Sequence, residues 1–314
     1  MPIISKMPEL NQSCLIIGVV IVTYNRIEDL KISISKTLLQ PVDIILVINN
    51  SSTDGTHAWL DSLEDDRVVA LHLPCNIGGA GGFSTGFKYI TENTNCDWIC
   101  CYDDDAYPTA DTFSKFRERN WLNIDGVAGA VYTPRGEINT MNIPIYSPFR
   151  DFKTFVNSII KMKTMIFISP ESYHSDKVIS VHGSSFVGFF VRVSSIRDRY
   201  GYPRAELFIY SDDAIYTCAI TRDGGQIVFC PEIKFVHAES STCTKDSVSL
   251  WRKYYQYRNG LEWLHLESSL VFWLFVPIKF VFWSVKMSKT KHGIKCTFMA
   301  VRDAILRKFN LYQM

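Results

Sequence analysis

Three consecutive carboxylates, Asp103, Asp104 and Asp105, follow an apolar run of the sequence. Adjacent negative charges repel one another, so keeping all three ionised is unfavourable unless something offsets the repulsion. A divalent cation such as Mn²⁺ or Mg²⁺ does this, because these ions prefer oxygen ligands. Alternate residues of an extended segment point the same way, so Asp103 and Asp105 can share a metal ion while Asp104 faces elsewhere. Taken alone, the triplet fits a solvated turn equally well.

A glycine-rich stretch, NIGGAGGF at residues 76–83, is a second feature with chemical meaning. Its glycines and Asn76 let a polar ligand approach the backbone closely, because glycine has no side chain in the way. The stretch is neither GxxxxGK[ST] nor a GxGxxG directly after the first strand. The P-loop and Rossmann interpretations therefore both lack support.

Composition limits the class of protein. The chain has 314 residues, of which 47% are apolar, enough for one large α/β domain or two smaller ones. Its 33 Lys and Arg residues balance 32 Asp and Glu residues, so we expect no nucleic-acid partner. The nine cysteines form no pair of CxxC motifs and predict reduced thiols in a cytoplasmic protein. The N-terminus lacks the pattern of a signal peptide, so we expect no export.

Buried strands alternate with helices in the first part of the chain. The continuous apolar run 15–23 predicts a strand buried on both faces of a parallel sheet, and 42–48 predicts another. Helices are expected over about 26–39, after Gly55 and after the glycines at 78–82, with further strands at VVALHL and DWICCY. This is an open, doubly wound α/β pattern, in which ligands bind beyond the carboxyl ends of the strands. Four loops fall at that edge: TYNR, NNSSTDGT, NIGGAGGF and DDD.

The second part of the chain is less regular. Residues 134–177 carry scattered prolines and aromatics, which predicts an insertion or lid over the site. Order returns over 178–193, and Ser211 is expected to cap a helix that ends near 224–225. QIVFCPEIKFVH then predicts two short strands, and the chain from about residue 245 predicts helices.

The ordered set of VIVTYNR, NNSSTDGT, NIGGAGGF and DDD resembles the inverting family 2 glycosyltransferases of the GT-A type. The resemblance covers roughly residues 15–260, and the order of the motifs is more specific than any one of them. It implies an α/β protein of the GT-A (nucleotide-diphospho-sugar transferase) fold, with a mixed, mainly parallel sheet and a helical, partly apolar C-terminal tail. Within the family, the motifs are most similar to those of galactofuranosyltransferases, with rhamnosyltransferases next.

The resemblance also implies ligand-binding residues. In the family, the first three loops hold a nucleotide and the acidic motif holds the metal that bridges its diphosphate. For this chain it implies Mn²⁺ or Mg²⁺ on Asp103, Asp105 and His237, although a histidine at a strand end is otherwise a common surface or core residue. Many members carry an Asp where this chain has Asn50, whose amide can still bond to uracil or ribose. The implied nucleotide-binding residues are Thr23, Tyr24, Asn25, Arg26, Asn50, Asn76, Gly78, Gly79 and Asp104.

Sugar transfer with inversion needs a base for the acceptor hydroxyl and neutralisation of the departing diphosphate. YSDDAIY resembles the family's catalytic acidic motif, which makes Asp213 the candidate base and Asp212 the carboxylate that positions the acceptor. Without the resemblance, acidic residues in the first turn of a helix are explained by the helix dipole alone. His182, which precedes Gly183, is a further candidate for an acceptor-loop residue.

Residues 270–286 form the most hydrophobic segment, interrupted by Pro277 and Lys279. A membrane span needs about 20 apolar residues, so we expect this segment to be too short and too interrupted to cross a bilayer. Its aromatic and basic residues predict a helix lying in an anionic membrane surface, with packing on the catalytic domain or another subunit as the alternative. These residues are Trp263, Trp273, Trp283, Lys286, Lys289, Lys291 and Lys295.

Together these features predict a metal-dependent transferase that moves galactofuranose from UDP-galactofuranose to a growing surface polysaccharide or lipid-linked glycan, at the inner face of the cytoplasmic membrane. The alternatives are a rhamnosyltransferase that uses dTDP-rhamnose and a non-catalytic module that binds nucleotide sugar or polysaccharide. The expected catalytic domain is 1–244, with a nucleotide-binding half at about 15–132, an acceptor-binding half at about 178–244, and a helical region at 245–314. The prediction is compatible with an oligomer.

Overall fold

A computed structural model describes residues 15–150, 155–156, 166–238, 249–288, 290, 292–309 and 311–312 of the chain. The predicted boundary between residues 244 and 245, Lys289 and Lys291 lie outside these residues. The strands are β1 (Ile17–Thr23), β2 (Ile44–Asn49), β3 (Val68–His72), β4 (Trp98–Asp103), β5 (Ala106–Pro108), β6 (Gly126–Tyr132), β7 (Ile145–Tyr146), β8 (Ile166–Phe167), β9 (Ile179–Val181), β10 (Phe189–Arg192) and β11 (Ile227–His237).

Within the described residues, nine strands form one mixed sheet. Their order is β3–β2–β1–β4–β10–β6–β11–β5, and β9 pairs with β11. Neighbours among β3, β2, β1 and β4 are parallel, whereas β10 runs antiparallel to both β4 and β6. The carboxyl ends of β1, β2 and β4 therefore meet at one edge, as the sequence predicts. β7 and β8 form a separate hairpin.

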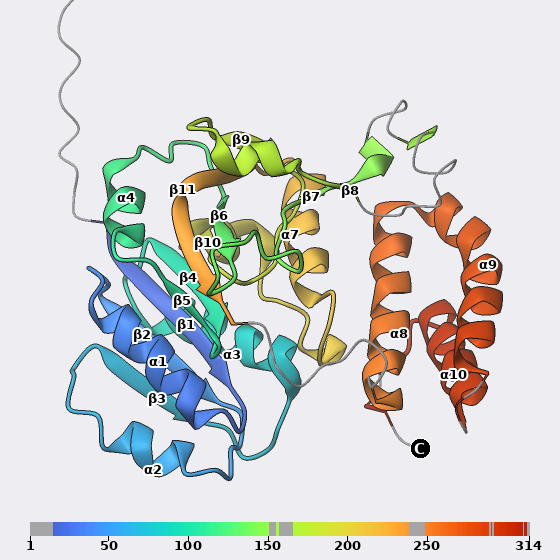
Figure 1. Ribbon diagram of the computed structural model, residues 1–314, viewed down its shortest axis with the longest axis horizontal. Coiled ribbons are helices and arrows are strands. Elements are labelled where there is room, and N and C mark those ends of the chain that lie inside the picture. Colours follow the sequence, from blue (N-terminus) through green and yellow to red (C-terminus); the bar gives the residue numbers. More distant parts are fainter. Residues whose placement is uncertain are drawn as a thin grey trace, which may run out of the picture.

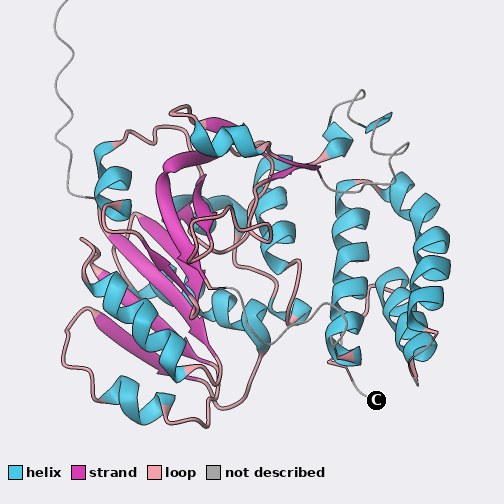
Figure 2. Cartoon of the chain, in the orientation of Figure 1, coloured by secondary structure: helices cyan, strands magenta, loops and turns pink. Residues whose placement is uncertain are grey.

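Helices cover both faces of the sheet and continue beyond it. They are α1 (Ile27–Leu38), α2 (Thr56–Asp61), α3 (Gly78–Asn93), α4 (Thr112–Glu118), α6 (Val193–Ser195), α7 (Asp212–Arg222), α8 (Leu250–Glu267), α9 (Ser269–Met287) and α10 (Gly293–Ile305), with short 3₁₀ turns η1 (Pro148–Arg150), η2 (Pro170–His174) and η4 (Ala205–Leu207) and a π-helical turn η3 (Ile196–Tyr200). Figure 1 shows α8, α9 and α10 side by side next to α7, away from β1, β2 and β3. In Figure 2 this C-terminal part consists of helices without strands among its described residues.

The continuous apolar run that predicts a first strand forms β1, and all seven of its residues are buried. Val19 and Ile21 point into a core shared with α1 and α4, whereas Val20 and Val22 point into a core shared with α3 and α7. Side chains of a strand alternate between its faces, so a strand covered on both sides needs apolar residues at every position.

The glycines at 78–82 lie inside the first turns of α3, so the prediction of a helix that begins after them is wrong. Glycine is a poor helix former, but here close packing outweighs propensity. A Cβ at Gly82 would lie 2.5 Å from Cγ1 of Val22 in β1. The absence of a side chain lets α3 approach the sheet and sets its first turn against the end of β1.

QIVFCPEIKFVH forms the single strand β11, where the sequence predicts two short strands. Pro231 has no N–H to donate to a neighbouring strand, which favoured a break. The pairing of β11 with β6 instead shifts register between Cys230 and Lys234, and the irregular stretch contains Pro231. The bulge keeps the strand continuous up to His237.

Helix α9 continues through Pro277 for 19 residues, so this proline does not shorten the helix, contrary to the expectation that the segment is too short and too interrupted to cross a bilayer. By length and composition alone the helix is long and apolar enough to cross a membrane. One of its faces packs into the helical core through Val271, Phe272 and Phe275. The opposite face of α9 is exposed.

Candidate active site

A cavity of about 1020 Å³ opens beyond the carboxyl ends of β1, β2 and β4. All but two of the predicted site residues line it, namely Thr23, Tyr24, Arg26, Asn50, Asn76, Gly78, Gly79, Asp103, Asp104, Asp105, Asp212, Asp213 and His237. One exception is Asn25, whose Oδ1 accepts a 2.7 Å hydrogen bond from the N–H of Thr53 and so ties two loops together beside the cavity. His182 also lies outside the lining, and its Nδ1 accepts from the N–H of Ser147 at 2.8 Å.

Asp103, Asp105 and His237 form a compact cluster in this cavity. One ligand atom from each lies within 4.8 Å of the others, and Nε2 of His237 is 3.1 Å from Oδ1 of Asp105. Asp103 ends β4, and the antiparallel pairing of β11 with β5 places His237 beside the residue that follows Asp105. Asp104 points away from the cluster and accepts a 2.8 Å hydrogen bond from Oγ1 of Thr23. The sequence predicts this separation of Asp104 from the other two carboxylates, but its cause is the turn between β4 and β5, which contains Asp104 and Asp105, and not strand alternation.

Asn142 determines which nitrogen of His237 faces the two aspartates. Nδ2 of Asn142 donates to Oγ of Ser185 at 2.9 Å, which turns Oδ1 toward the ring, 2.8 Å from Nδ1 of His237. An amide oxygen only accepts, so Nδ1 carries a hydrogen. The charge of Asp105, 3.1 Å from Nε2, favours a second hydrogen on that nitrogen and raises the pKa of His237. When this hydrogen is lost, Nε2 keeps the lone pair that a metal ligand needs.

The charges around the cluster shift its pKa values in opposite directions. Burial, and then the charge of Asp105, raise the pKa of Asp103 to about 6. Burial also raises the pKa of Asp104 to about 7, although Arg26 opposes it. Burial would raise the pKa of Asp105 as well, but the hydrogen bond and charge of His237, with Arg26, outweigh it and hold that pKa below its ordinary value. Burial lowers the pKa of His237, but the hydrogen bond and charge of Asp105 raise it by more. The pKa of His237 therefore lies above its ordinary value. A positive charge nearby is therefore needed to keep Asp103 and Asp104 fully ionised.

The loops on the nucleotide side are held by their own side chains. Asn50 donates from Nδ2 to the carbonyl oxygen of Gly78 at 2.9 Å and accepts on Oδ1 from the N–H of Ile77 at 2.9 Å. Oδ1 of Asn76 accepts from the N–H of Gly78 at 2.8 Å. Gly78 has φ +77°, and a Cβ there would lie 2.1 Å from the carbonyl oxygen of Phe208. Asn50 therefore shapes the turn that borders the cavity, and its contact with a nucleoside stays a prediction.

Asp212 and Asp213 begin α7 and line the same cavity as Asp103, Asp105 and His237. Burial raises both pKa values, that of Asp213 to about 6 despite the hydrogen bond that its Oδ1 accepts from the N–H of Ala214 at 2.7 Å. After burial and Asp105, the charge of Asp213 also contributes to the raised pKa of Asp103. The two acidic groups are therefore close enough to interact.

The segment that leads into α7 has an unusual backbone. Phe208, Tyr210 and Ser211 have φ values of 67°, 69° and 59°. Outside glycine, left-handed backbone costs about 1–2 kcal/mol per residue. The side chain of Ser211 makes no capping hydrogen bond, so the predicted cap is wrong. Capping side chains act from extended backbone, which Ser211 does not adopt.

Comparison with known proteins decides the family. The family model described as "Glycosyl transferase family 2" matches residues 18–175, half of the chain. The chain belongs to this family.

The related proteins and solved structures are distant from this chain in sequence. An undecaprenyl-phosphate mannosyltransferase of Micrococcus luteus is 34% identical over 76 residues, which is 23% of this chain and 31% of that protein. The structure of S. aureus TarS 1-349 superposes with a TM-score of 0.53 and 12% identity over 81% of this chain and 65% of that one. The structure of GalNAc-T7 with UDP, GalNAc and Mn²⁺ superposes with a TM-score of 0.60 and 11% sequence identity, over 93% of this chain and 55% of that one. The chain thus spans less than two thirds of each relative, and the likeness shows the GT-A fold.

Helix α8 forms one wall of the cavity, a position that the sequence did not predict. Trp251, Arg252, Tyr255 and Gln256 line the cavity from this helix, and Tyr312 joins them. The aromatic run WRKYYQY signals burial, but a helix pattern alone does not say which neighbour its apolar side meets. Asn142 was also missed, because its contact with His237 spans 95 residues of sequence.

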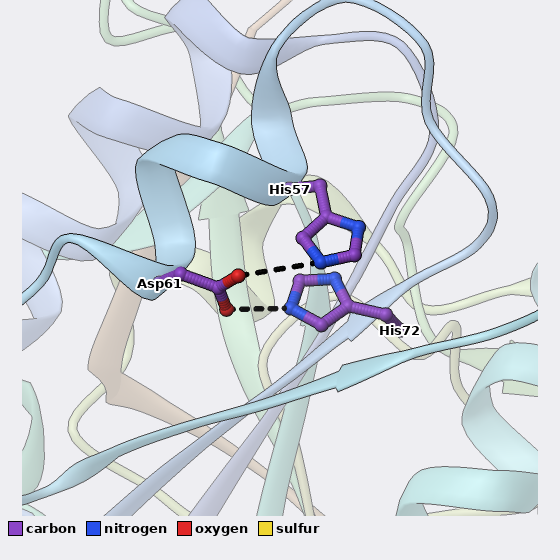
Figure 3. Close-up of side chains that lie close together, drawn as sticks. All are labelled: His57, Asp61 and His72. Atoms are coloured by element: carbon purple, nitrogen blue, oxygen red, sulfur yellow. Dashed lines mark hydrogen bonds and ion pairs between the residues drawn. The ribbon is translucent and has the colours of Figure 1, made fainter.

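His57, Asp61 and His72 form a second group of potential ligands among the described residues (Figure 3), in which His72 has the tautomer opposite to that of a metal-binding His237. Both Nε2 atoms face Asp61, at 3.3 Å from His57 and 3.0 Å from His72, and the two rings stack 3.7 Å apart. Asn49 accepts the N–H of Ser52 on Oδ1, so its Nδ2 faces Nδ1 of His72 at 2.9 Å and donates to it. The neutral ring of His72 then carries its hydrogen on Nε2, where a metal would need a lone pair. This exposed group links α2 to β3 by hydrogen bonds.

Proposed function

We propose that this chain is a metal-dependent inverting glycosyltransferase that moves galactofuranose from UDP-galactofuranose to a growing surface polysaccharide or lipid-linked glycan. One observation carries the proposal: Asp103, Asp105 and His237 converge in the same cavity as the buried pair Asp212 and Asp213. The cavity thus offers a ligand set for a cation beside a carboxylate that can take a proton. GalNAc-T7, a protein of the same fold, was solved with UDP, GalNAc and Mn²⁺.

The chemistry of the donor set supports a divalent metal. The cavity is lined by five carboxylates but only two arginines, Arg26 and Arg252, so a diphosphate entering alone would be repelled. Asp103, Asp105 and His237 would hold Mn²⁺ or Mg²⁺, with His237 presented through Nε2. When bound, such an ion neutralises charge on the departing diphosphate.

Asp213 is the proposed base. The acceptor hydroxyl oxygen bonds to the anomeric carbon, the bond from that carbon to the diphosphate breaks, and the hydroxyl proton passes to the Asp213 carboxylate. Its pKa of about 6 suits this role, because the group is ionised at neutral pH and still basic enough to accept a proton. Asp212, whose pKa lies well above its ordinary value through burial and the charge of Asp213, would hold the acceptor by hydrogen bonds.

The donor is tested directly by consumption of nucleotide sugar. The full chain with Mn²⁺ and a lipid-linked or polysaccharide acceptor is incubated with UDP-galactofuranose or with dTDP-rhamnose. Consumption of the first alone supports the proposal, and consumption of the second alone establishes a rhamnosyltransferase. UDP binding without consumption of either donor establishes a binding module.

Asn142→Leu is expected to weaken Mn²⁺ binding in the presence of UDP by about 10-fold to 100-fold, the usual effect of removing the partner that orients a histidine ligand. The leucine removes the acceptor at Nδ1 of His237 and frees the ring to adopt either tautomer. Calorimetry with Mn²⁺ measures the effect. Asn142→Asp is the matched control, since it keeps an acceptor oxygen at that position and should retain most of the affinity. Equal Mn²⁺ affinity in Asn142→Leu and the unmodified chain would reject this role.

The exposed face of α9 supports attachment to the membrane surface at the inner face of the cytoplasmic membrane. Its exposed apolar residues recur at helical spacing and form one stripe: Leu270, Trp273, Leu274, Ile278, Val281, Phe282 and Val285. Lys286, which follows Val285 in α9, and Lys295 of α10 are exposed and would favour anionic lipid. Removing residues 270–314 is an unsuitable test, because the other face of α9 packs into the core through Val271 and Phe272.

Phe282→Asp combined with Val285→Asp is expected to lower affinity for phosphatidylglycerol vesicles at least about tenfold, because two apolar side chains that enter the bilayer surface contribute several kcal/mol. Both side chains are exposed, at 64% and 69%, so the fold is preserved. Sedimentation with vesicles is the measurement. Leu39→Asp with Leu122→Asp, at 76% and 72% exposure on other elements, is the control pair. Unchanged sedimentation of the α9 variant would exclude this face as the anchor.

A further inference from the structure

We propose that Asn259 and Arg258 of α8 are positioning residues that hold segment 206–211 and thereby fix the place of Asp213 in the cavity. The inference rests on the proposed role of Asp213 as base. It assigns a function in the reaction to buried residues of α8, in addition to the residues of this helix that line the cavity.

Asn259 bonds to three carbonyl groups of this segment with one side-chain nitrogen. Its Nδ2 lies 2.9 Å from the oxygen of Leu207, 2.8 Å from that of Ile209 and 2.9 Å from that of Tyr210. An amide nitrogen has two hydrogens, so one of them is shared between two acceptors. The side chain is completely buried. Bulk water therefore does not compete for these bonds in the folded chain.

Arg258 sets the orientation of that amide. Its Nε donates to Oδ1 of Asn259 at 2.9 Å, so Nδ2 must face the carbonyl groups. Its Nη2 donates to the oxygens of Leu207 and Glu206 at 3.1 and 3.4 Å. The buried guanidinium lies over the ring of Tyr255, 4.9 Å from its centre. The pair therefore acts as one unit.

The segment needs an external support because its backbone is unfavourable by itself. Phe208 has φ 67° and ψ −59°, and the N–H of Ile209 bonds to the oxygen of Leu207 at 2.8 Å. This is the form of three-residue turn that is rare and strained. Tyr210 and Ser211 follow with positive φ. Strained backbone persists when surrounding contacts determine it.

Every carbonyl group from 206 to 210 has a partner outside the segment. Arg258 bonds to residues 206 and 207, Asn259 to 207, 209 and 210, and the N–H of Ala80 in α3 to the oxygen of Phe208 at 3.1 Å. Ser211 joins this segment directly to Asp212 and Asp213 at the start of α7. A change in the peptide orientations before Ser211 would therefore move the base relative to the metal ligands.

The test measures amide hydrogen exchange and transfer on the full chain. In Asn259→Ala, the rate of amide exchange in peptides covering 206–213 should rise at least about tenfold. The three hydrogen bonds from Asn259, which oppose local opening of this segment, are absent in the variant. With UDP-galactofuranose and Mn²⁺, kcat should fall about a hundredfold, as for a misplaced catalytic group, while the donor KM changes far less. Arg258→Lys keeps the charge, removes the bond to Oδ1 of Asn259, and should show both effects in weaker form. It serves where Asn259→Ala does not fold.

Thr297→Val is the control in the same helical region. It keeps the shape of the side chain and removes a buried 3.1 Å bond within α10, from Oγ1 of Thr297 to the oxygen of Gly293. It should raise exchange in α10 and leave 206–213 and kcat unchanged. The inference is overturned by unchanged exchange of 206–213 in Asn259→Ala and Arg258→Lys, or by a rise that Thr297→Val matches. Failure of the proposed function has a different signature, a transfer rate in Asp213→Asn equal to that of the unmodified chain.

Discussion

Replacing Asp213 with asparagine should lower the transfer rate about a hundredfold to ten-thousandfold, the usual contribution of a positioned general base. The amide keeps the size of the side chain and an oxygen that accepts from the N–H of Ala214, but it cannot take the acceptor's proton. Burial raises the pKa values of both Asp212 and Asp213, and the charge of Asp213 raises that of Asp212 further, so a neutral side chain at position 213 removes repulsion. The melting temperature at pH 7 should therefore be equal or higher, and UDP affinity with Mn²⁺ should barely change.

Donor consumption and calorimetry on one preparation measure these two quantities. The unmodified chain should also lose activity as the pH falls through about 6, because protonation of Asp213 removes the base. Asp212→Asn is the control for the neighbouring carboxylate. If Asp213→Asn transfers sugar within a few-fold of the unmodified chain while Asp212→Asn does not, Asp212 is the base. If neither variant is slower, the base is another residue.

Removing divalent metal should reduce transfer about a thousandfold or more, since stabilisation of charge on the leaving group by a metal is worth several kcal/mol. The lining carboxylates repel the donor's diphosphate when no cation lies among them. Donor consumption is measured in excess EDTA and again after Mn²⁺ or Mg²⁺ is restored. EDTA saturated with Mn²⁺ beforehand is the control. Undiminished transfer in free EDTA would contradict the metal requirement.

His237→Ala should raise the Mn²⁺ concentration needed for half-maximal transfer without unfolding the chain. His237 ends β11, and its removal leaves the apolar core around that strand intact. His72→Ala is the matched control, because His72 also ends a strand beside an aspartate but has the tautomer that disfavours metal. The same Mn²⁺ dependence in His237→Ala and the unmodified chain would remove His237 from the ligand set.

Much of the sheet could be predicted because its determinants are local. The run 15–23 is continuously apolar up to Thr23, and a strand covered on both faces requires such a run. Propensity failed where packing between distant segments decides. The glycines that predict a loop form the start of α3 because Val22 needs close contact with Gly82. Pro231 predicts a break, yet a shift in register against β6 accommodates it.

The same distinction applies to the site. Asp103, Asp105, Asp212 and Asp213 stand in short motifs, so the sequence reveals their types and order. Asn142 has no such signal, because its function depends on a bond to a histidine in a different strand. The role of α8 depends on which of its faces meets segment 206–211. Helical periodicity predicts that a face is buried but does not predict its partner.

The turn before α3 has a consequence for how phosphate can bind. The first N–H groups of a helix ordinarily attract anions, and a glycine-rich start suggests such use. Here protein oxygens already occupy three of these donors: Asn50 accepts from Ile77, Asn76 from Gly78, and the carbonyl of Phe208 from Ala80. A phosphate group would gain these donors only by displacing bonds that hold the turn. The turn is thus an internally satisfied anion site, and a nucleotide's charge must be balanced elsewhere in the cavity.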